Sequence, residues 1–400
     1  MDTAPAASAC LPDSQSLDRR LLLGAAGLAG VAALSRLSQA GPLAPPAGPV
    51  TSTSRPLGEI EPRTPIGPAT TPGDATSLYR ITQPGSYYLT GNIQGVAGKH
   101  GILIAASDVT LDLNGFTLRG VGGASQGFSG IAGDPAFART VLRNGTIVNW
   151  DFYAVALSHS SSHYENLCAA DNVAGGIATS DNGSCIDCRS INNPTGFSFS
   201  AGTSAHRCHA SGSAFAGFNV FTGCVLTDCT AHASGTGFRT LAAGVVFRGC
   251  AAANNLGSGF EAGSNASLHM CSATSNTIHG ITASSDSHIA ECMSCRNGQH
   301  GISAFAGNHL HGNTCTSNGL TGSGYGINVT GTHNRLDGNH CTSNTQGIVI
   351  AAAPNLLVRN SVGGNSGNGY NITSNNGFGP NIFSSAGITS SGNPHANYEF

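Results

Sequence analysis

Charged side chains are scarce in this 400-residue chain: Asp, Glu, Lys and Arg together make up 9% of it, against roughly 25% in an ordinary soluble protein. The 17 basic and 20 acidic residues give a net charge of −3. They form no basic run, so neither nucleic acid nor an anionic membrane surface is an expected partner. Lys99 is the single lysine, which leaves few cations to neutralise an acidic substrate.

Glycine, in contrast, is abundant. The 56 glycines amount to about twice the usual share, which excludes an ordinary helical enzyme domain. With 40% hydrophobic residues, 16 Phe and 8 Tyr, the chain is too apolar for a disordered protein, and its glycines show no collagen period. We therefore predict a folded chain with little helix.

The N-terminus carries a targeting pattern. Arg19 and Arg20 stand directly before an apolar run over residues 21–34, and the small residues of 38–40 follow it. This pattern resembles a twin-arginine export signal that is removed after Ala40. A membrane anchor is the alternative, but a helix of that length spans about 21 Å of a hydrocarbon core of roughly 30 Å. The resemblance implies a periplasmic, cell-surface or extracellular protein with no membrane span after cleavage.

The rest of the chain divides into a linker and one folded part. Residues 41–72 are rich in proline and lack apolar periodicity, which predicts an extended linker. The folded part is expected over residues 73–400. Its two ends, about 73–98 and about 377–400, are expected to act as caps, because uncapped sheet edges invite polymerisation.

A glycine followed by a large apolar residue recurs along the folded part. The steps from Ile177 to Ile348 have a mean length of about 21 residues, which is typical of a repeat architecture. Another small or apolar residue usually follows two positions later, as in a short strand with one buried face. Two further apolar sites per repeat indicate two more strands, so we predict an all-β solenoid. The recurring pairs are Gly176-Ile177, Gly196-Phe197, Gly217-Phe218, Gly237-Phe238, Gly259-Phe260, Gly280-Ile281, Gly301-Ile302, Gly326-Ile327, Gly347-Ile348 and Gly369-Tyr370.

Particular segments resemble a known architecture. Gly101–Ile104 and Val109–Leu118 are similar to the N-terminal coils of a right-handed parallel β-helix, the pectate-lyase-like fold. Tyr79–Ile93 and Gly392–Phe400 resemble the two ends of secreted right-handed β-helix repeat proteins of bacteria. The resemblance implies roughly a dozen coils over residues 73–400, each close to 21 residues long.

The resemblance also implies an asparagine in the turn between the second and third strands, where it stacks on its neighbours. Four asparagines fit that turn, Asn114, Asn144, Asn313 and Asn339. Cysteines recur between them at steps of 20 or 21 residues, which predicts a single internal column. Its expected members are Cys168, Cys188, Cys208, Cys229, Cys250, Cys271 and Cys292. Side chains in register on parallel strands point the same way, so we expect free thiols, with a disulfide scaffold as the alternative.

Two pairs of cysteines have the C-x-x-C spacing of redox and zinc sites, Cys185 with Cys188 and Cys292 with Cys295. Five coils separate the pairs, about 24 Å at the spacing of parallel strands, so they cannot share one zinc ion. Each pair alone is half a site, and one cysteine of each belongs to the predicted column. We therefore predict no zinc and no cofactor here.

Histidines and surface charges offer further patterns. His309 and His311 could join His288 on the preceding coil as a metal site, but scattered surface histidines are the simpler interpretation, and no metal is predicted. A line of charges that alternates in sign precedes several of the column cysteines, and we interpret it as structural. This line comprises Asp187, Arg207, Asp228 and Glu291.

In enzymes of the pectate-lyase-like fold the polysaccharide lies over the first-strand sheet, so the outward positions there are the place to look for chemistry. Arg239, Glu261, His279 and His300 fall on four consecutive coils and are the candidate catalytic residues. The alternative is a surface ion pair flanked by solvated histidines. Glycoside hydrolysis needs two carboxyl groups, and Asp286 is the nearest second one. No group of aspartates suggests a calcium clamp for a uronide lyase, so the hydrolase and lyase motifs are not recognisable.

The predicted surface is rich in Ser, Thr, Asn and Gly, which can hydrogen-bond sugars with little charge. We therefore expect an exported protein that interacts with extracytoplasmic polysaccharide along its first-strand face. One alternative is a polysaccharide lyase, hydrolase or epimerase that uses the charged cluster. Another is a structural or adhesive surface protein without catalysis. The sequence leaves the oligomeric state open.

Overall fold

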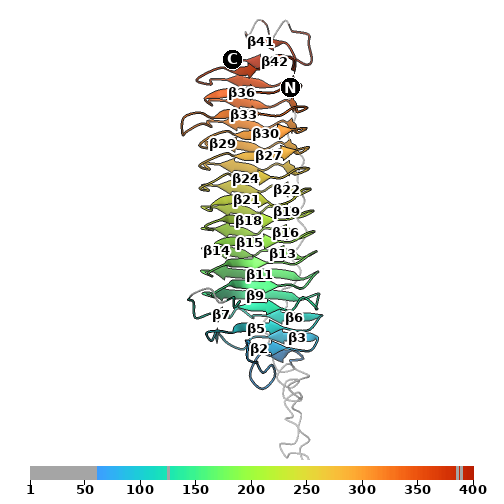
Figure 1. The fold of residues 1–400 in the computed structure, drawn as a ribbon, viewed down its shortest axis with the longest axis vertical. Coiled ribbons are helices and arrows are strands. Elements are labelled where there is room, and N and C mark those ends of the chain that lie inside the picture. Colours follow the sequence, from blue (N-terminus) through green and yellow to red (C-terminus); the bar gives the residue numbers. More distant parts are fainter. Residues whose placement is uncertain (1–60, 124–126, 384–386, 388–390) are drawn as a thin grey trace, which may run out of the picture. The chain divides into compact units, whose positions relative to one another are not determined.

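The computed structural model describes residues 61–123, 127–383, 387 and 391–400. The predicted export signal and most of the predicted linker lie outside this part of the chain. Two parallel β-sheets account for it, and their strands stack coil upon coil from β2 to β42 (Figure 1). Among the described residues, no helix has the length and apolarity needed to cross a membrane.

The 14-stranded sheet contains the first strand of each coil, and its order follows the chain, so the solenoid makes more coils than the dozen expected. We call its solvent side the first-strand face. Its strands are β2 (Ser77–Ile81), β5 (His100–Ile104), β8 (Ile131–Gly133), β10 (Tyr153–Leu157), β12 (Gly175–Ala178), β15 (Thr195–Phe199), β18 (Ala216–Val220), β21 (Thr236–Thr240), β24 (Phe260–Ala262), β27 (Ile281–Ser285), β30 (Ile302–Ala306), β33 (Tyr325–Val329), β36 (Gln346–Ile350) and β39 (Tyr370–Ile372).

The 28-stranded sheet contains the second and third strands of the coils and closes the other sides of the solenoid. The second-strand column comprises β1 (Thr64–Pro65), β3 (Gly85–Tyr88), β6 (Val109–Asp112), β13 (Ser184–Ile186), β16 (Ser204–His206), β19 (Val225–Thr227), β22 (Val246–Arg248), β25 (Ser267–His269), β28 (His288–Ala290), β31 (His309–His311), β34 (Arg335–Asp337), β37 (Leu356–Val358) and β40 (Gly377–Phe378). The third-strand column comprises β4 (Ile93–Gln94), β7 (Thr117–Arg119), β14 (Arg189–Ile191), β17 (His209–Ser211), β20 (Thr230–His232), β23 (Ala251–Ala253), β26 (Ser272–Thr274), β29 (Met293–Cys295), β32 (Thr314–Thr316), β35 (His340–Thr342), β38 (Ser361–Gly363), β41 (Asn381–Ile382) and β42 (Asn397–Glu399). Two longer strands, β9 (Val141–Val148) and β11 (His163–Ala170), pair with both columns.

Strand pairing begins before the predicted boundary of the folded part. Thr64 pairs with Tyr87 and Pro65 with Tyr88, so β1 lies inside the stretch predicted as a linker. The segment expected to cap the N-terminal end contains β2 and β3, which pair with β5 and β6 as ordinary coil strands do. A proline is tolerated in β1 because a terminal strand needs to donate hydrogen bonds on one side only.

The interior is filled by side chains that repeat at the same place in successive coils. Phe197, Phe218, Phe238 and Phe260 stack with ring centroids 4.7–4.8 Å apart and nearly parallel planes. Isoleucines take this position in most of the remaining coils, and all are fully buried. The period-two alternation predicted for the first strand is therefore confirmed. Each strand is too short to bury its apolar face alone, and the stack of successive coils buries it.

The repeated glycine has a steric cause. A Cβ on Gly217 would lie 2.8 Å from the carbonyl oxygen of Gly237 and 2.9 Å from the Cβ of Ala231. The start of the first strand thus passes so close to its neighbours that no side chain fits. The Gly-apolar signal of the sequence marks the start of the first strand in these coils.

The corner between the second and third strands is a single residue in the left-handed conformation. Asp228, with φ of 53°, separates β19 from β20, and the following Cys229 turns inward and is fully buried. The internal column of cysteines is confirmed from Cys188 to Cys292. Cys168 is not part of it, because Cys168 pairs with Arg189, and Leu167 occupies the inward position instead. The cysteines among the described residues are free thiols.

Asparagine side chains continue this column at its C-terminal end. The backbone N–H and Nδ2 of Asn313 both donate to Oδ1 of Asn339, at 3.0 and 2.9 Å. The sequence analysis identified these two correctly but missed Asn360 and Asn397, which extend the same ladder. Asn114 and Asn144 also lie in this turn, as expected, but one residue before the inward position, because both adopt the left-handed corner conformation itself.

A second asparagine ladder lies at the corner after the third strand. Its asparagines bond to one another through the same pair of contacts wherever they occupy adjacent coils, and they satisfy backbone N–H groups that the corners would otherwise leave buried and unpaired. Ser213 and Ser234 take the place of asparagine in two coils. The asparagines of the ladder are Asn172, Asn193, Asn255, Asn276, Asn297, Asn318, Asn344 and Asn365.

Candidate functional site

The first-strand face has the register that the sequence predicts. Arg239 pairs with Glu261, and Glu261 pairs with Thr282 on the next coil. The outward positions on the neighbouring coils are uncharged, and the next charged residue of this column is Arg80, on β2 at its N-terminal end. The uncharged positions are Ala178, Ser198 and Asn219 before Arg239, and Ser303, Asn328, Val349 and Asn371 after Thr282.

Arg239 and Glu261 form a solvated ion pair. Nε of Arg239 lies 3.6 Å from Oε2 of Glu261, and the two side chains are 52% and 39% exposed. Thr236, on the preceding coil, donates its hydroxyl hydrogen to Oε1 of Glu261 at 3.3 Å. An exposed pair of this kind stabilises a fold by about 0–1 kcal/mol. Both contacts draw the carboxylate toward the preceding coil.

His279, His300 and Tyr325 form a stacked column beside the strands. The rings of His279 and His300 are 4.9 Å apart and 11° from parallel, and those of His300 and Tyr325 are 4.7 Å apart. These residues immediately precede the repeated glycines, so each ring lies over the ring of the next coil. Stacking at the coil spacing is the same device that orders the buried phenylalanines.

The two imidazoles are held neutral with one tautomer fixed. The backbone N–H of Tyr325 donates to Nδ1 of His300 at 3.1 Å, and that of His300 donates to Nδ1 of His279 at 3.3 Å. An Nδ1 that accepts a hydrogen bond cannot carry a proton, so the ring proton of each is on Nε2. Burial lowers the pKa of His279, and burial together with the neighbouring His279 lowers the pKa of His300 to about 4.

This shift makes stability depend on pH. The unfolded chain protonates His300 below its ordinary pKa of 6.5, whereas the folded chain does so only near 4. Unfolding therefore takes up a proton between these values, and stability falls as the pH is lowered through that window. We expect wild type to lose about 2 kcal/mol more than the His300→Gln variant between about pH 7 and about pH 4.5, measured by urea unfolding. Equal losses in the two proteins would contradict the buried neutral imidazole.

The structure does not gather the four candidate residues into one catalytic set. His279 precedes Thr282, the partner of Glu261, by three residues, which is about 10 Å along a strand. Asp286 follows Thr282 by four residues, or about 13 Å, beyond the 5–9.5 Å at which paired carboxyl groups hydrolyse glycosides. The carboxylate of Glu261 moreover points to the preceding coil. The face thus holds an ion pair and a separate histidine column.

Exposed apolar side chains flank the first-strand face on both sides, and the sequence analysis did not identify them. Phe215, Leu256 and Leu320 stand at the corner before the first strand and are 70%, 72% and 68% exposed. Phe221 stands at the opposite corner and Phe305 at an outward position near the end of β30, and they are 41% and 57% exposed. We call these five residues the apolar rims. Their signal in the sequence is a large apolar residue at a corner or outward strand position where most repeats have a small or polar one.

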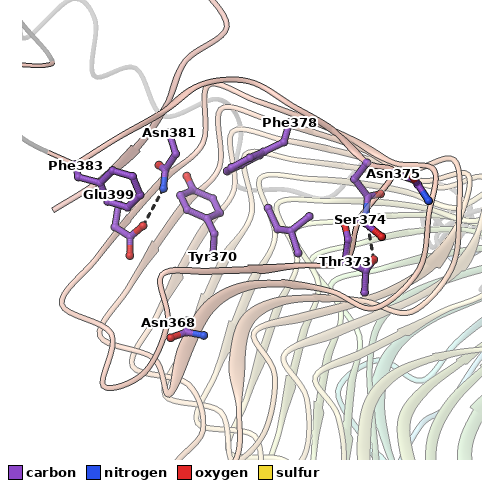
Figure 2. Close-up of a pocket in the computed structure, with 11 residues that line it drawn as sticks. Asn368, Tyr370, Thr373, Ser374, Asn375, Phe378, Asn381, Phe383 and Glu399 are labelled. Atoms are coloured by element: carbon purple, nitrogen blue, oxygen red, sulfur yellow. Dashed lines mark hydrogen bonds between the residues drawn. The ribbon is translucent and has the colours of Figure 1, made fainter.

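A pocket lies at the last coil, where the last repeat meets the segment predicted as a C-terminal cap (Figure 2). Its volume is about 630 Å³, within the range of small-molecule sites. Tyr370, Phe378 and Phe383 supply aromatic surface, and Asn381 donates from Nδ2 to Oε2 of Glu399 at 2.9 Å. Figure 2 shows Thr373, Ser374 and Asn375 at the end away from Glu399. The remaining lining residues are Asn368, Ile372 and Asn376.

Comparison with known proteins defines the class. The family model of the right handed beta helix region matches residues 203–334, and the chain is a right-handed parallel β-helix. Among solved structures it is similar to the A-module of the mannuronan C-5 epimerase AlgE6 of Azotobacter vinelandii, with 15% identity, a TM-score of 0.52, and coverage of 74% of this chain and 89% of that one. A search of curated proteins found no match to the sequence.

Two further solved structures are similar with lower TM-scores. The Dettilon tailspike protein gp208 shares 14% identity, with a TM-score of 0.48 and coverage of 63% of this chain and 61% of that one. The pectate lyase Pel9A shares 15% identity, with a TM-score of 0.36 and coverage of 64% and 69%. At these identities the likeness concerns the fold.

Proposed function

We propose that this protein is exported by the twin-arginine route and binds an extracytoplasmic polysaccharide along its first-strand face. The observation that carries the proposal is a long, almost uncharged polar face between two apolar rims. Serine, threonine and asparagine on the face can exchange hydrogen bonds with sugar hydroxyls. Phe215 and Phe305 on the rims offer flat surfaces to the C–H faces of pyranose rings.

The histidine column adds fixed donors to the same face. Because Nδ1 of His279 and of His300 accepts a backbone hydrogen bond, Nε2 of each imidazole donates. Neutral donors suit a neutral glycan as well as a uronate. The likeness to an epimerase that acts on mannuronan supports the substrate class through the fold alone.

The experiment is a binding screen of the full chain against neutral and uronic polysaccharides. For a glycan that binds, Phe215→Ala and Phe305→Ala should each weaken affinity by roughly three- to tenfold, because each removes one stacking surface. Met270→Ala is the matched control, since Met270 is 58% exposed at the second-to-third-strand corner, away from the face. Equal affinity in wild type and all three variants would place the binding site away from the apolar rims.

The same samples test the catalytic alternative. Reducing ends and the absorbance of unsaturated products report hydrolysis and lyase cleavage, and Glu261→Ala is the paired variant. Turnover that disappears in Glu261→Ala would make the protein an enzyme whose site is on the first-strand face. Neither binding nor turnover would leave a structural or adhesive surface protein.

A further inference from the structure

A group of metal-ligating side chains lies on the second-strand column, on a different sheet from the first-strand face. His309 and His311 are two residues apart on β31, so both project outward while Leu310 between them is buried. On the next coil, Arg335 pairs with His309 and Asp337 pairs with His311. The register thus brings two imidazoles and one carboxylate together.

The ligand atoms are close enough to converge on one ion. One nitrogen from His309, one from His311 and a carboxylate oxygen of Asp337 all lie within 4.8 Å of one another. Ligands of a tetrahedral zinc ion, at about 2.1 Å from the metal, are roughly 3.4 Å apart. Small side-chain rotations would close this difference. Among the described residues, this is the only group of three or more such side chains with that spacing.

An unused donor atom points to a missing ligand. Nε2 of His309 is buried from solvent and has no hydrogen-bond partner, and buried polar atoms in folded proteins are almost always paired. The ring of His288 stacks on that of His309 at 5.0 Å and restricts its rotation. The sequence suggested His288 as the third ligand. The structure brings Asp337 to that place instead.

Two arginines, Arg335 and Arg359, contact Asp337 and would influence how tightly the group binds a metal ion. Arg359 donates from Nε to Oδ1 of Asp337 at 2.7 Å, while Oδ2 accepts from both Arg335 and Arg359. Oδ1 therefore keeps a free lone pair for a metal. The guanidinium groups also hold the carboxylate, whose side chain is 4% exposed, in a fixed orientation. Their positive charge repels a metal cation, so we expect metal binding here to be weak and exchangeable.

We propose that His309, His311 and Asp337 form a binding site for a divalent transition-metal ion such as Zn²⁺. Two imidazole nitrogens and one carboxylate oxygen are ligands that zinc, cobalt, nickel and copper prefer, whereas calcium and magnesium favour sites made of oxygen alone. Three protein ligands leave a coordination position open to water or to a further molecule.

The test is a titration of the full, chelator-treated chain with Co²⁺, whose visible absorption reports imidazole ligation, followed by displacement with Zn²⁺. We expect saturable binding that His309→Ala and His311→Ala each weaken by at least about tenfold. His232→Ala is the matched control, because His232 is also an exposed strand histidine, and it should bind as wild type does. Unchanged melting temperatures without metal would show that all variants fold.

A variant that binds Co²⁺ more tightly would distinguish the proposed three-ligand site from adventitious binding to single histidines. Arg335→Gln removes a positive charge beside His309 and should tighten Co²⁺ binding by roughly three- to tenfold. Adventitious binding at scattered histidines would be insensitive to this change. The proposal is overturned if wild type does not bind, if the histidine variants bind equally well, or if Arg335→Gln binds no more tightly.

Discussion

Replacing Cys229 by aspartate should destabilise the protein by about 4 kcal/mol or more, because the carboxylate would be buried without a partner. Cys229 is fully buried, and its neighbours in the column, Cys208 and Cys250, offer only thiols. Their Sγ atoms already donate to backbone carbonyl groups of their own and of the preceding coils. Urea unfolding monitored by circular dichroism would measure the loss.

Cys168→Asp is the matched control. The spacing of the cysteines alone places Cys168 in the same column, whereas the structure turns it outward, with Leu167 inside. We therefore expect a much smaller loss from Cys168→Asp than from Cys229→Asp. A Cys229→Ala variant separates the buried charge from the loss of the thiol. If Cys229→Asp and wild type unfold together, the inward assignment of the column is wrong.

Replacing Asn297 by alanine should cost about 3 kcal/mol, because it breaks the second asparagine ladder in the middle. Oδ1 of Asn297 accepts from both the backbone N–H and Nδ2 of Asn276, each at 3.0 Å. Its own Nδ2 donates to Asn318 at 2.9 Å and to the carbonyl oxygen of Ala273 at 3.1 Å. Alanine would leave two buried donors unpaired, each at about 1–3 kcal/mol.

The control is Asn371→Ala, on an exposed outward position of the first-strand face, where the amide bonds only to Gln346. It should change the free energy of unfolding by less than about 0.5 kcal/mol. Differential scanning calorimetry of the two variants beside wild type would rank them. A small effect of Asn297→Ala would mean that water replaces the ladder amides, and that the ladder contributes little.

The coil repeat was predictable because its cause is local. Gly217 and its counterparts leave no room for a Cβ, so the glycine recurs at the start of the first strand, and the apolar residue after it fills the stack. The error at Cys168 has an equally local cause. A step of 20 residues to Cys188 fits the period, but Asn166 rather than Leu167 takes the left-handed corner and moves the inward position by one.

The candidate site was less predictable than the fold. The spacing of the repeats correctly paired Arg239 with Glu261 and placed His279 and His300 on consecutive coils, where the structure shows that their rings stack. It could not show that the carboxylate turns to the preceding coil, since that depends on the hydroxyl of Thr236. Most residues of the apolar rims and of the terminal pocket stand at corners or near the C-terminal end, at positions that the repeat pattern does not specify.

The corner before the first strand has a consequence for how this surface can change. Between Asn297 and Ile302 the chain takes five residues, but between Asn318 and Ile327 it takes nine, and the asparagine ladder still closes across the longer coil at 2.9–3.0 Å. The extra residues, Leu320 among them, loop out beside the first-strand face without moving the register. Insertions at this corner can therefore change the surface beside the first-strand face, and with it the binding specificity, while the strands and ladders of the coil keep their register.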